Sequence, residues 1–344
     1  MKVLSPYGKN VLAELKDIYG FDSVESATRF VISHLQQQYQ FQAIEVETLH
    51  IAYGLVAKLK ADGEIYHLKF ASRSMHDSPD QLFPWLDYAR NHGVLLPEVI
   101  STIDGNWYSS PLENIDSNYN IVYLMRDVPG KPMKQASESL LRQYAEAMAQ
   151  FHLVGLEYPH SVQGIDEIGV DETWRDKRED CHALSSELKD APLISQELLS
   201  EAMQLIEKTQ VCELTRTIVH GDFRFCHVFF EDNTLSGLVD VDESTQGERL
   251  IELCYGLASS SSPEGGSFLT FEQLRSTLVM YHQCLPLSEA EQSILKGVFA
   301  WAFLETLCGL SEIQATKKDI DKTQTILRAV LKVSTEELLD GAGF

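Results

Sequence analysis

Two carboxylates lie beside short apolar runs between residues 219 and 243. Asp222 follows one run, within His220-Gly221-Asp222, and Asp240 ends another. The polar residues 231–233 between them predict a turn, so the apolar runs are interpreted as two returning strands. Buried strands end at the rim of a core, which brings the two carboxylates near one another. A hairpin with acidic ends is the alternative, but a second component of a phosphate site lies upstream, and we favour a functional site.

This segment resembles the catalytic segment of the aminoglycoside phosphotransferase and choline kinase family. Those enzymes resemble protein kinases in fold and phosphorylate hydroxyls of small molecules. Their usual pattern is H-G-D-x-x-x-x-N, followed by a strand and an Asp. The resemblance implies that Asp222 is the catalytic base and that Asp240 binds Mg²⁺. His227 stands where the Asn is usual, as it does in the macrolide phosphotransferases of the same family.

The chemistry implied by the resemblance requires little covalent participation by the protein. Phosphoryl transfer needs a positioned hydroxyl and neutralised phosphate charge, so Asp222 would accept the hydroxyl's hydrogen bond while Asp240 and His227 hold the metal. An imidazole suits softer metals than Mg²⁺, so Mn²⁺ should support turnover at least as well. A metal-binding imidazole is neutral, so activity should decline below about pH 6.5. Arg224 could screen Asp222 or contact a phosphate, and a structural role in the loop is the alternative.

Composition limits the classes of function. The chain has 344 residues, enough for two lobes, and a formal net charge of -23 that argues against nucleic-acid or anionic-membrane partners. The six cysteines form no metal-ligand spacing and fit reduced thiols. The N-terminus lacks the apolar region of a signal peptide, and the apolar stretch near residues 298–304 is short for a membrane span. We therefore expect a soluble, cytoplasmic protein, as a monomer or homodimer.

Residues 1–43 are expected to form an N-terminal helical extension. Leu12, Leu15 and Ile18 recur at helical spacing before Gly20. Asp22 is then expected to cap a second helix, with Glu25 in the capping-box position.

Strands are predicted from residue 44 onward, where the apolar period changes to two. Asp62-Gly63 is a strong hairpin signal between two of these strands. Residues 52–54 bend the first strand into the second, and Tyr53 and Gly54 there are candidates for a loop over nucleotide phosphates. Further strands are predicted at 96–100, 106–108 and 121–125.

Lys69 is the upstream component of the site. It alternates with Leu68 and Phe70 along a predicted strand, so it takes the face opposite the apolar one. The resemblance implies that Lys69 pairs with the α- and β-phosphates of ATP. It also implies a carboxylate on the helix 79–91 to steady this lysine, for which Asp80 is the nearest candidate and Asp87 the second.

The resemblance further implies a hinge between two lobes. Backbone groups of Leu124, Met125, Arg126 and Asp127 would bind the adenine edge. The following Pro129-Gly130 ends the strand.

Most of the remaining chain is predicted to be helical. We expect helices over 138–154, within 171–210, and over 271–284, 288–312 and 318–340, with a loop at 259–267. His152 is expected to be a satisfied core histidine and Trp174 an anchor. By resemblance, Glu252 buttresses the catalytic loop and the segment 171–210 helps to shape the acceptor site.

These observations predict a two-lobed, protein-kinase-like α+β fold. Its parts would be the extension 1–43, a nucleotide-binding lobe 44–127 with a small antiparallel sheet, and a helical lobe 128–344 with the acceptor site. The predicted activity is ATP-dependent phosphorylation of a small-molecule hydroxyl, with Mg²⁺ or Mn²⁺. Asp242, Glu243 and Glu248 could pair with amino groups of a cationic acceptor, or they are solvated loop charges. A nucleotide-binding pseudokinase with a regulatory or scaffold role is the alternative.

Overall fold

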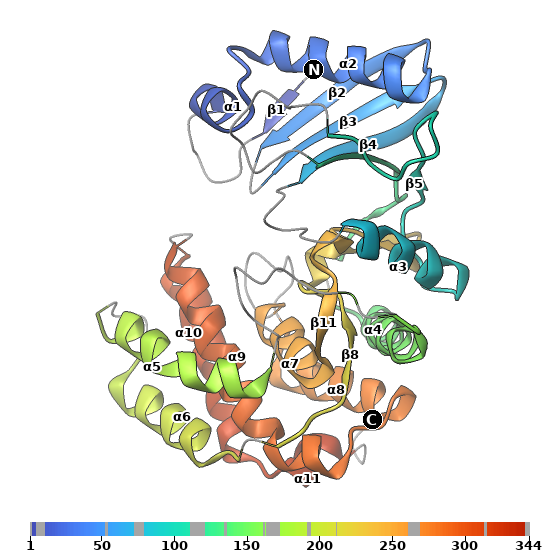
Figure 1. Ribbon diagram of the computed structural model, residues 1–344. Helices are drawn as coiled ribbons and strands as arrows, with labels where there is room; N and C mark the ends of the chain where they lie inside the picture. The colour runs from blue at the N-terminus through green and yellow to red at the C-terminus, as the bar shows by residue number, and fades with distance from the viewer. Residues whose placement is uncertain are drawn as a thin grey trace. The chain divides into compact units, whose positions relative to one another are not determined.

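The protein falls into two compact units. The computed structural model describes residues 2–4, 11–51, 54–71, 79–110, 121–133, 136–160, 162, 173–190, 194–210, 212–260, 269–312 and 315–340. One unit comes from Met1–Arg90 and Pro97–Val128, the other from Asn91–Leu96, Pro129–Gly164 and Gly169–Phe344. A sheet forms the centre of the first unit, and helices make up most of the second (Figure 1). The α+β class predicted from the sequence is confirmed.

The sheet of the first unit has the strand order β1-β2-β3-β4-β6-β5. Its elements are β1 (Lys2–Leu4), α1 (Val11–Tyr19), α2 (Val24–Tyr39), β2 (Ile44–Ile51), β3 (Leu55–Ala61), β4 (Glu64–Ala71), α3 (Pro79–Asn91), β5 (Val99–Ile100) and β6 (Ile121–Arg126). β1 pairs in parallel with β2, whereas the other pairs are antiparallel. The sheet is therefore mixed rather than purely antiparallel, because α1 and α2 supply the long connection that a parallel pair needs.

The alternation along β4 assigns each side chain to a face. Tyr66, Leu68 and Phe70 are at most 6% exposed and belong to the core of the unit. Lys69 takes the opposite face, as the sequence predicts. The hairpin between β3 and β4 turns at Asp62 and Gly63, whose φ angles of 48° and 95° are both positive. That geometry is the type I′ turn expected of an Asp-Gly pair.

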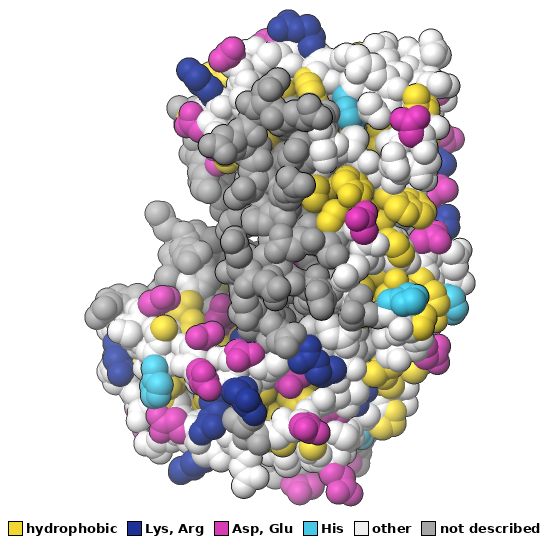
Figure 2. Space-filling view, viewed as in Figure 1, with side chains coloured by type: hydrophobic (Ala, Val, Ile, Leu, Met, Phe, Trp, Pro, Cys, Tyr) yellow, Lys and Arg dark blue, Asp and Glu magenta, His cyan; other side chains and the backbone are white. Residues whose placement is uncertain are grey.

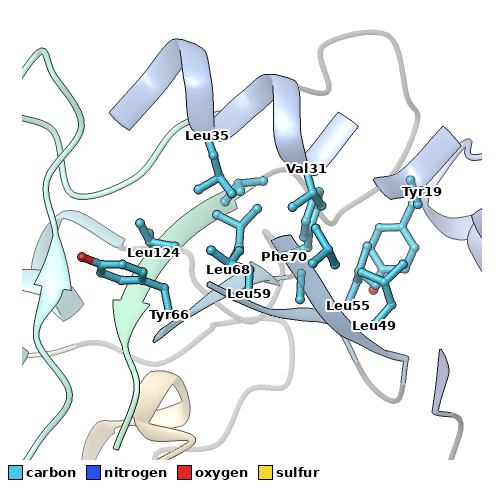
Figure 3. Close-up of a cluster of buried hydrophobic side chains, with 14 of the residues drawn as sticks. Tyr19, Val31, Leu35, Leu49, Leu55, Leu59, Tyr66, Leu68, Phe70 and Leu124 are labelled. Carbon is cyan, nitrogen blue, oxygen red and sulfur yellow. The ribbon is translucent and has the colours of Figure 1, made fainter. Parts of the chain in front are cut away.

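Helices α1 and α2 cover one face of this sheet and share its core. Tyr19 of α1 and Val31 and Leu35 of α2 pack with Leu68 and Phe70 of β4 (Figure 3). The expected helices within residues 1–43 are present, and the same segment also contains β1. It contributes to the core of the first unit.

The expected cap of α2 is wrong by one residue. Ser23, not Asp22, precedes the helix, and its Oγ accepts a hydrogen bond from the N–H of Ser26 at 3.1 Å. The Oγ of Ser26 accepts from the N–H of Ser23 at 3.1 Å in return. The capping box is therefore Ser23 with Ser26, because the hydroxyl geometry, rather than the carboxylate of Glu25, satisfies both N–H groups.

The second unit is built mainly of helices with short strand pairs. Its elements are β7 (Lys131–Pro132), α4 (Glu138–Glu157), α5 (Trp174–Asp190), α6 (Gln196–Lys208), β8 (Arg216–Val219), the 3₁₀ turn Phe225–His227, β9 (Val228–Glu231), β10 (Thr234–Leu238), the 3₁₀ turn Val241–Glu243, β11 (Thr245–Glu248), α7 (Arg249–Ser259), α8 (Phe271–Cys284), α9 (Glu289–Glu312), α10 (Lys317–Lys332) and α11 (Thr335–Leu339). β9 pairs with β10 and β7, and β8 pairs with β11. The predicted turn between β9 and β10 is confirmed at Asp232 and Asn233.

Helix α9 forms much of the interior of the second unit. The window Glu289–Leu310 has a mean hydropathy of 1.4 and is long and apolar enough to cross a membrane by length and composition alone. Inside the structure, 72% of that window is buried. It packs against α5, α6, α7 and α10. These are the properties of a core helix, and the apolar stretch is longer than the sequence analysis expected.

One predicted strand is absent, and one predicted helix is divided in two. Residues 106–108 form no strand, because Thr102–Asn106 turns the chain, and Ser109 alone makes a single bridge to Val122. The predicted helix 318–340 is divided at Ser334, whose Oγ accepts from the N–H of Glu337 at 3.1 Å and starts α11. A serine that caps a new helix also ends the previous one.

The predicted loop 259–267 begins later than expected. Ser259 ends α7 and Ser260 is its C-cap, and these residues are 4% and 0% exposed. Residues 261–267 lie outside the described residues.

Charged side chains are dispersed over the described part of one face of the protein. Acidic and basic side chains are interspersed among the described residues of the face shown in Figure 2, although the chain as a whole carries a formal net charge of -23. Salt screens exposed charges beyond about 10 Å. Dispersed charge of this kind does not by itself define a binding face.

Candidate active site

The loop after β8 carries the predicted base and has room only for glycine at its centre. Gly221 has a φ of +87°, and a Cβ there would lie 2.6 Å from the carbonyl oxygen of Glu243. The loop therefore lies directly against the 3₁₀ turn Val241–Glu243. This close approach positions Asp222 beside the segment that follows Asp240.

Glu252 of α7 buttresses this loop, as predicted. Its Oε2 accepts from the N–H of His220 at 2.9 Å, and its Oε1 accepts from the N–H of Gly221 at 2.7 Å. The Nε2 of His152 lies 2.8 Å from Oε2. Burial would raise the pKa of Glu252, but the hydrogen bond and charge of His152, with the contacts of His220, lower it. The buried carboxylate is therefore ionised and holds the loop by two backbone bonds.

His152 is the satisfied core histidine that the sequence predicts. It is 0% exposed, and its Nδ1 lies 2.8 Å from the hydroxyl of Tyr281. Both ring nitrogens are thus hydrogen-bonded, and its role is to orient Glu252.

His220 ties together the two segments that bear the carboxylates. Its Nδ1 accepts from the N–H of Asp222 at 3.2 Å, so the proton is on Nε2, which donates to the carbonyl oxygen of Val239 at 3.0 Å. Burial lowers the pKa of His220 and favours the neutral ring. One neutral imidazole therefore links the backbone at Asp222 to the residue before Asp240. The sequence analysis did not predict this role.

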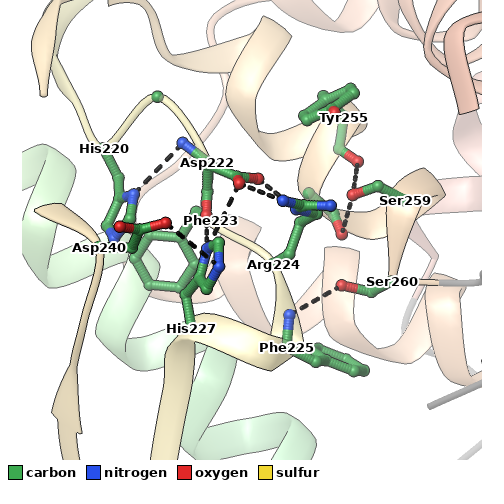
Figure 4. A network of polar contacts seen from close by, with 12 residues as sticks. His220, Asp222, Phe223, Arg224, Phe225, His227, Asp240, Tyr255, Ser259 and Ser260 are labelled. Carbon is green, nitrogen blue, oxygen red and sulfur yellow. Dashed lines mark hydrogen bonds and ion pairs between the residues drawn. The ribbon is translucent and has the colours of Figure 1, made fainter. Parts of the chain in front are cut away.

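Asp222, His227 and Asp240 form one cluster (Figure 4). One ligand atom from each lies within 4.8 Å of the others. The Nδ1 of His227 donates to the main-chain oxygen of Asp222 at 2.9 Å, while its Nε2 lies 3.5 Å from Oδ2 of Asp240. The backbone bond thus directs Nε2 toward the second carboxylate. The structure brings together the three residues that the sequence assigned to the base and metal site.

The carboxylates of the cluster favour a positive charge on His227. Burial would lower the pKa of His227, but a hydrogen bond with Cys226 and the charges of Asp222 and Asp240 raise it to about 10. A site that binds a proton this tightly between two carboxylates also suits a divalent cation, which replaces the proton. Two carboxylates with one imidazole fit Mn²⁺ at least as well as Mg²⁺.

Arg224 pairs with the predicted base. Its Nε and Nη2 donate to Oδ1 and Oδ2 of Asp222. The side chains are 21% and 13% exposed, so water screens the pair only partly. A planar guanidinium that binds both oxygens fixes the orientation of the carboxylate. Arg224 therefore contacts the side chain of the predicted base itself.

The three acidic residues proposed for the acceptor differ in environment. Asp242 is 3% exposed, whereas Glu243 is exposed. Glu248 is 7% exposed, and its Oε2 accepts from the N–H of Trp174 at 2.6 Å. Burial raises the pKa of Glu248. Glu248 thus anchors the start of α5, and Trp174, 0% exposed, is the anchor that the sequence predicts.

The first unit carries the residues assigned to the nucleotide. Lys69 lies on β4, opposite Tyr123 of β6. Asp80 accepts a hydrogen bond from the hydroxyl of Tyr108 at 3.2 Å, and its pairing with Lys69 stays a prediction. Tyr53 lies outside the described residues. Gly54 is described, and a Cβ there would lie 3.0 Å from the carbonyl oxygen of Phe70.

The hinge residues make contacts that the sequence did not reveal. Leu124 and Met125 pair with β4 and β5, and the N–H groups of Arg126 and Asp127 donate to Glu98 and Ile65 at 2.9 and 3.0 Å. The Oδ1 of Asp127 lies 2.6 Å from Nε2 of His67 and accepts from Lys58 at 3.2 Å. Burial would raise the pKa of Asp127, but His67 and Lys58 lower it. An adenine edge would therefore need a donor other than these two N–H groups.

A pocket in the second unit opens beside the loop. Its lining includes Lys177, Gly221, Glu248, Tyr255, Trp301 and Glu305. Trp301 and Glu305 are one helical turn apart on α9, a spacing that was available in the sequence. Their place in this pocket could not be predicted from the sequence, because no local pattern indicates that α9 faces the loop that carries Asp222.

The fold and the site together define a phosphotransferase of the protein-kinase-like class. The model of the phosphotransferase enzyme family (APH) matches residues 54–282, more than half of the chain. The chain belongs to this family, and it is a small-molecule phosphotransferase.

Solved structures share the fold at low sequence identity. The amicoumacin kinase hAmiN, in complex with AMP-PNP, Ca²⁺ and Ami, is 14% identical with a TM-score of 0.57, covering 92% of this chain and 100% of that one. A putative aminoglycoside phosphotransferase from Ralstonia eutropha JMP134 is 15% identical with a TM-score of 0.56, covering 90% and 98%. A thermostable mutant of aminoglycoside phosphotransferase APH(4)-Ia, with AMP-PNP and hygromycin B, is 16% identical with a TM-score of 0.55, covering 92% and 99%.

Proposed function

We propose that this protein transfers the γ-phosphoryl group of ATP to a hydroxyl of a small, amine-bearing molecule. The observation that carries the proposal is the cluster of Asp222, His227 and Asp240, with ligand atoms within 4.8 Å of one another. Its supporting loop is held by Glu252 through two backbone N–H groups. Such pre-organisation is what phosphoryl transfer asks of a protein.

In this reaction the acceptor oxygen forms a bond to the γ-phosphorus, and the bond from that phosphorus to the bridging oxygen of ADP breaks. The hydroxyl proton passes to Asp222, whose carboxylate Arg224 orients. His227 and Asp240 would hold a divalent cation, which would neutralise phosphate charge. Lys69 is the proposed contact to the α- and β-phosphates. The hinge 124–127 is the proposed neighbour of the adenine, through groups other than the N–H groups of Arg126 and Asp127.

An amine-bearing acceptor is favoured by three observations. Acidic side chains lie around the loop, with Glu243 exposed beside it. Two structures with the same fold are described as complexes with hygromycin B and with Ami. The net charge of -23 also favours the approach of cations over anions.

The test is phosphoryl transfer from ATP and from GTP, with Mg²⁺ or Mn²⁺, to a panel of aminoglycosides, amino sugars and amino alcohols. We expect Asp222→Asn to lower kcat by roughly 10²- to 10³-fold while nucleotide binding remains. Asp232→Asn is the matched control, because that Asp lies exposed in the nearby turn. No turnover of any acceptor by the wild-type protein, with nucleotide still bound, would overturn the proposal in favour of a pseudokinase.

A further inference from the structure

The pocket beside the loop is next to the predicted base. Gly221, which precedes Asp222, forms part of its lining, and so does Tyr255 of α7. Burial raises the pKa of Tyr255, and the charge of Asp222 raises it further, which reflects their proximity. A molecule in this pocket would therefore approach the carboxylate that accepts the hydroxyl proton.

Helix α9 presents an aromatic ring and a carboxylate to this pocket. Trp301 and Glu305 are four residues apart, so they lie on the same helical face. Trp301 is 3% exposed, and its ring centroid lies 6.3 Å from that of Tyr255. Two aromatic rings beside a carboxylate are the groups that bind an ammonium ion.

The ammonium group of a lysine side chain already occupies the face of the Trp301 ring. The Nζ of Lys177, from α5, lies over the ring of Trp301, 5.6 Å from its centroid. That distance is within the range of an attractive cation–π contact. The face of Trp301 is therefore shaped to accept a primary ammonium group.

Two further carboxylates of the pocket hold backbone groups. Glu248 binds the N–H of Trp174, and Glu252 binds those of His220 and Gly221. Neither can turn toward a ligand without releasing α5 or the catalytic loop. Glu305 shares a helical face with Trp301, so it is placed to pair with whichever cation stands over the ring.

We propose that Trp301 and Glu305 form the subsite for an ammonium group of the acceptor, and that Lys177 is an internal competitor for it. This inference rests on the proposed function and names the part of the acceptor that the pocket selects. Lys177 must leave the ring when the acceptor binds. Cations that bind too weakly to displace Lys177 are therefore excluded. This makes Lys177 a specificity-determining residue.

The test is calorimetric titration of the full chain, without nucleotide, with 2-deoxystreptamine, a cyclitol with two amino groups. The neutral cyclitol myo-inositol is the matched ligand. We expect Lys177→Met to tighten binding of 2-deoxystreptamine by roughly 3- to 10-fold, because the competing cation is removed while the apolar stem remains. Binding of myo-inositol should not change. Glu305→Gln should weaken binding of 2-deoxystreptamine by a similar factor.

Two variants serve as controls. Lys177→Arg keeps a cation over the ring and should bind 2-deoxystreptamine as the wild type does. Lys189→Met makes the same change of charge at an exposed position of α5 and should also leave binding unchanged. Weaker or unchanged binding by Lys177→Met would overturn the proposal, as would an unchanged affinity in Glu305→Gln. Because no ATP is present, these outcomes are independent of whether phosphoryl transfer is found.

Discussion

The guanidinium of Arg224 binds both carboxylate oxygens of Asp222, two residues before it in the same loop. A carboxylate held by a planar, two-pronged donor has one orientation. In the proposed reaction Asp222 meets the acceptor hydroxyl, so Arg224 would control the geometry of the base. During the reaction one oxygen has to be shared with the substrate, which a guanidinium with several N–H groups permits.

Replacement of Arg224 by lysine should therefore lower kcat more than it changes nucleotide binding. Lysine keeps the charge but provides a point contact instead of a fork. We expect kcat to fall by roughly 10- to 100-fold, since a small misplacement of a reacting group has an effect of that size. Steady-state kinetics measure it, with Arg328→Lys as control because Arg328 is exposed on α10 and contacts Ser195 and Gln324. Unchanged kcat in Arg224→Lys would show that the pairing is not needed.

Metal binding should be coupled to a proton on His227. The pKa of His227 is about 10 in the metal-free protein, so the ring is charged at neutral pH and must lose its proton to bind a metal through Nε2. The affinity for Mn²⁺ should then rise by about tenfold per pH unit between about pH 7 and pH 9. The sequence placed this dependence near 6.5; the neighbouring carboxylates move it upward.

The control for this coupling is His227→Asn, which offers an amide oxygen and has no proton to lose. Its affinity for Mn²⁺, measured by calorimetry over the same pH range, should vary much less. A slope equal to that of the wild type would mean that the released proton comes from another group.

The carboxylate of Glu252 should contribute substantially to stability. Glu252→Gln leaves one of the N–H groups of His220 and Gly221 facing an amide donor, and we expect a loss of about 2–4 kcal/mol in urea unfolding. The pKa of Glu252 lies below its usual value of 4.5, so this stabilisation is complete above about pH 4.5 and is lost as the pH falls further. The wild type should lose stability below pH 4.5 more steeply than the variant. Glu272→Gln, at an exposed position of α8, should change neither property.

Gly221→Ala should damage the site more than an equivalent change elsewhere. Gly221 and Gly93 have φ angles of +87° and +89°, so alanine has similar backbone strain at both positions, of about 1–2 kcal/mol. At Gly221 the new Cβ also meets the carbonyl oxygen of Glu243 at 2.6 Å, whereas nothing lies within 4 Å at Gly93. We expect Gly221→Ala to lose at least 10-fold more activity than Gly93→Ala at matched strain. Equal losses, measured by turnover and thermal unfolding, would show that the loop can move away without consequence.

Local signals account for what could be predicted. The Asp62-Gly63 turn, the alternation around Lys69 and the residues 220–240 follow from the preferences of a few neighbouring residues, and the structure confirms the elements they predict. Ser23 rather than Asp22 caps α2 because boundaries depend on single hydroxyl contacts that a pattern cannot resolve. β1 was missed because a three-residue strand has no period of its own.

The clustering of Asp222, His227 and Asp240 could be predicted from the sequence, because they lie within one short segment whose strands and turns form locally. Which residues from distant segments contact this one depends on the folded chain. His152 of α4 reaches the carboxylate of Glu252, and Lys177 of α5 meets Trp301 of α9. Contacts between distant segments depend on how the apolar faces of whole helices pack together, and no short stretch of residues encodes that arrangement.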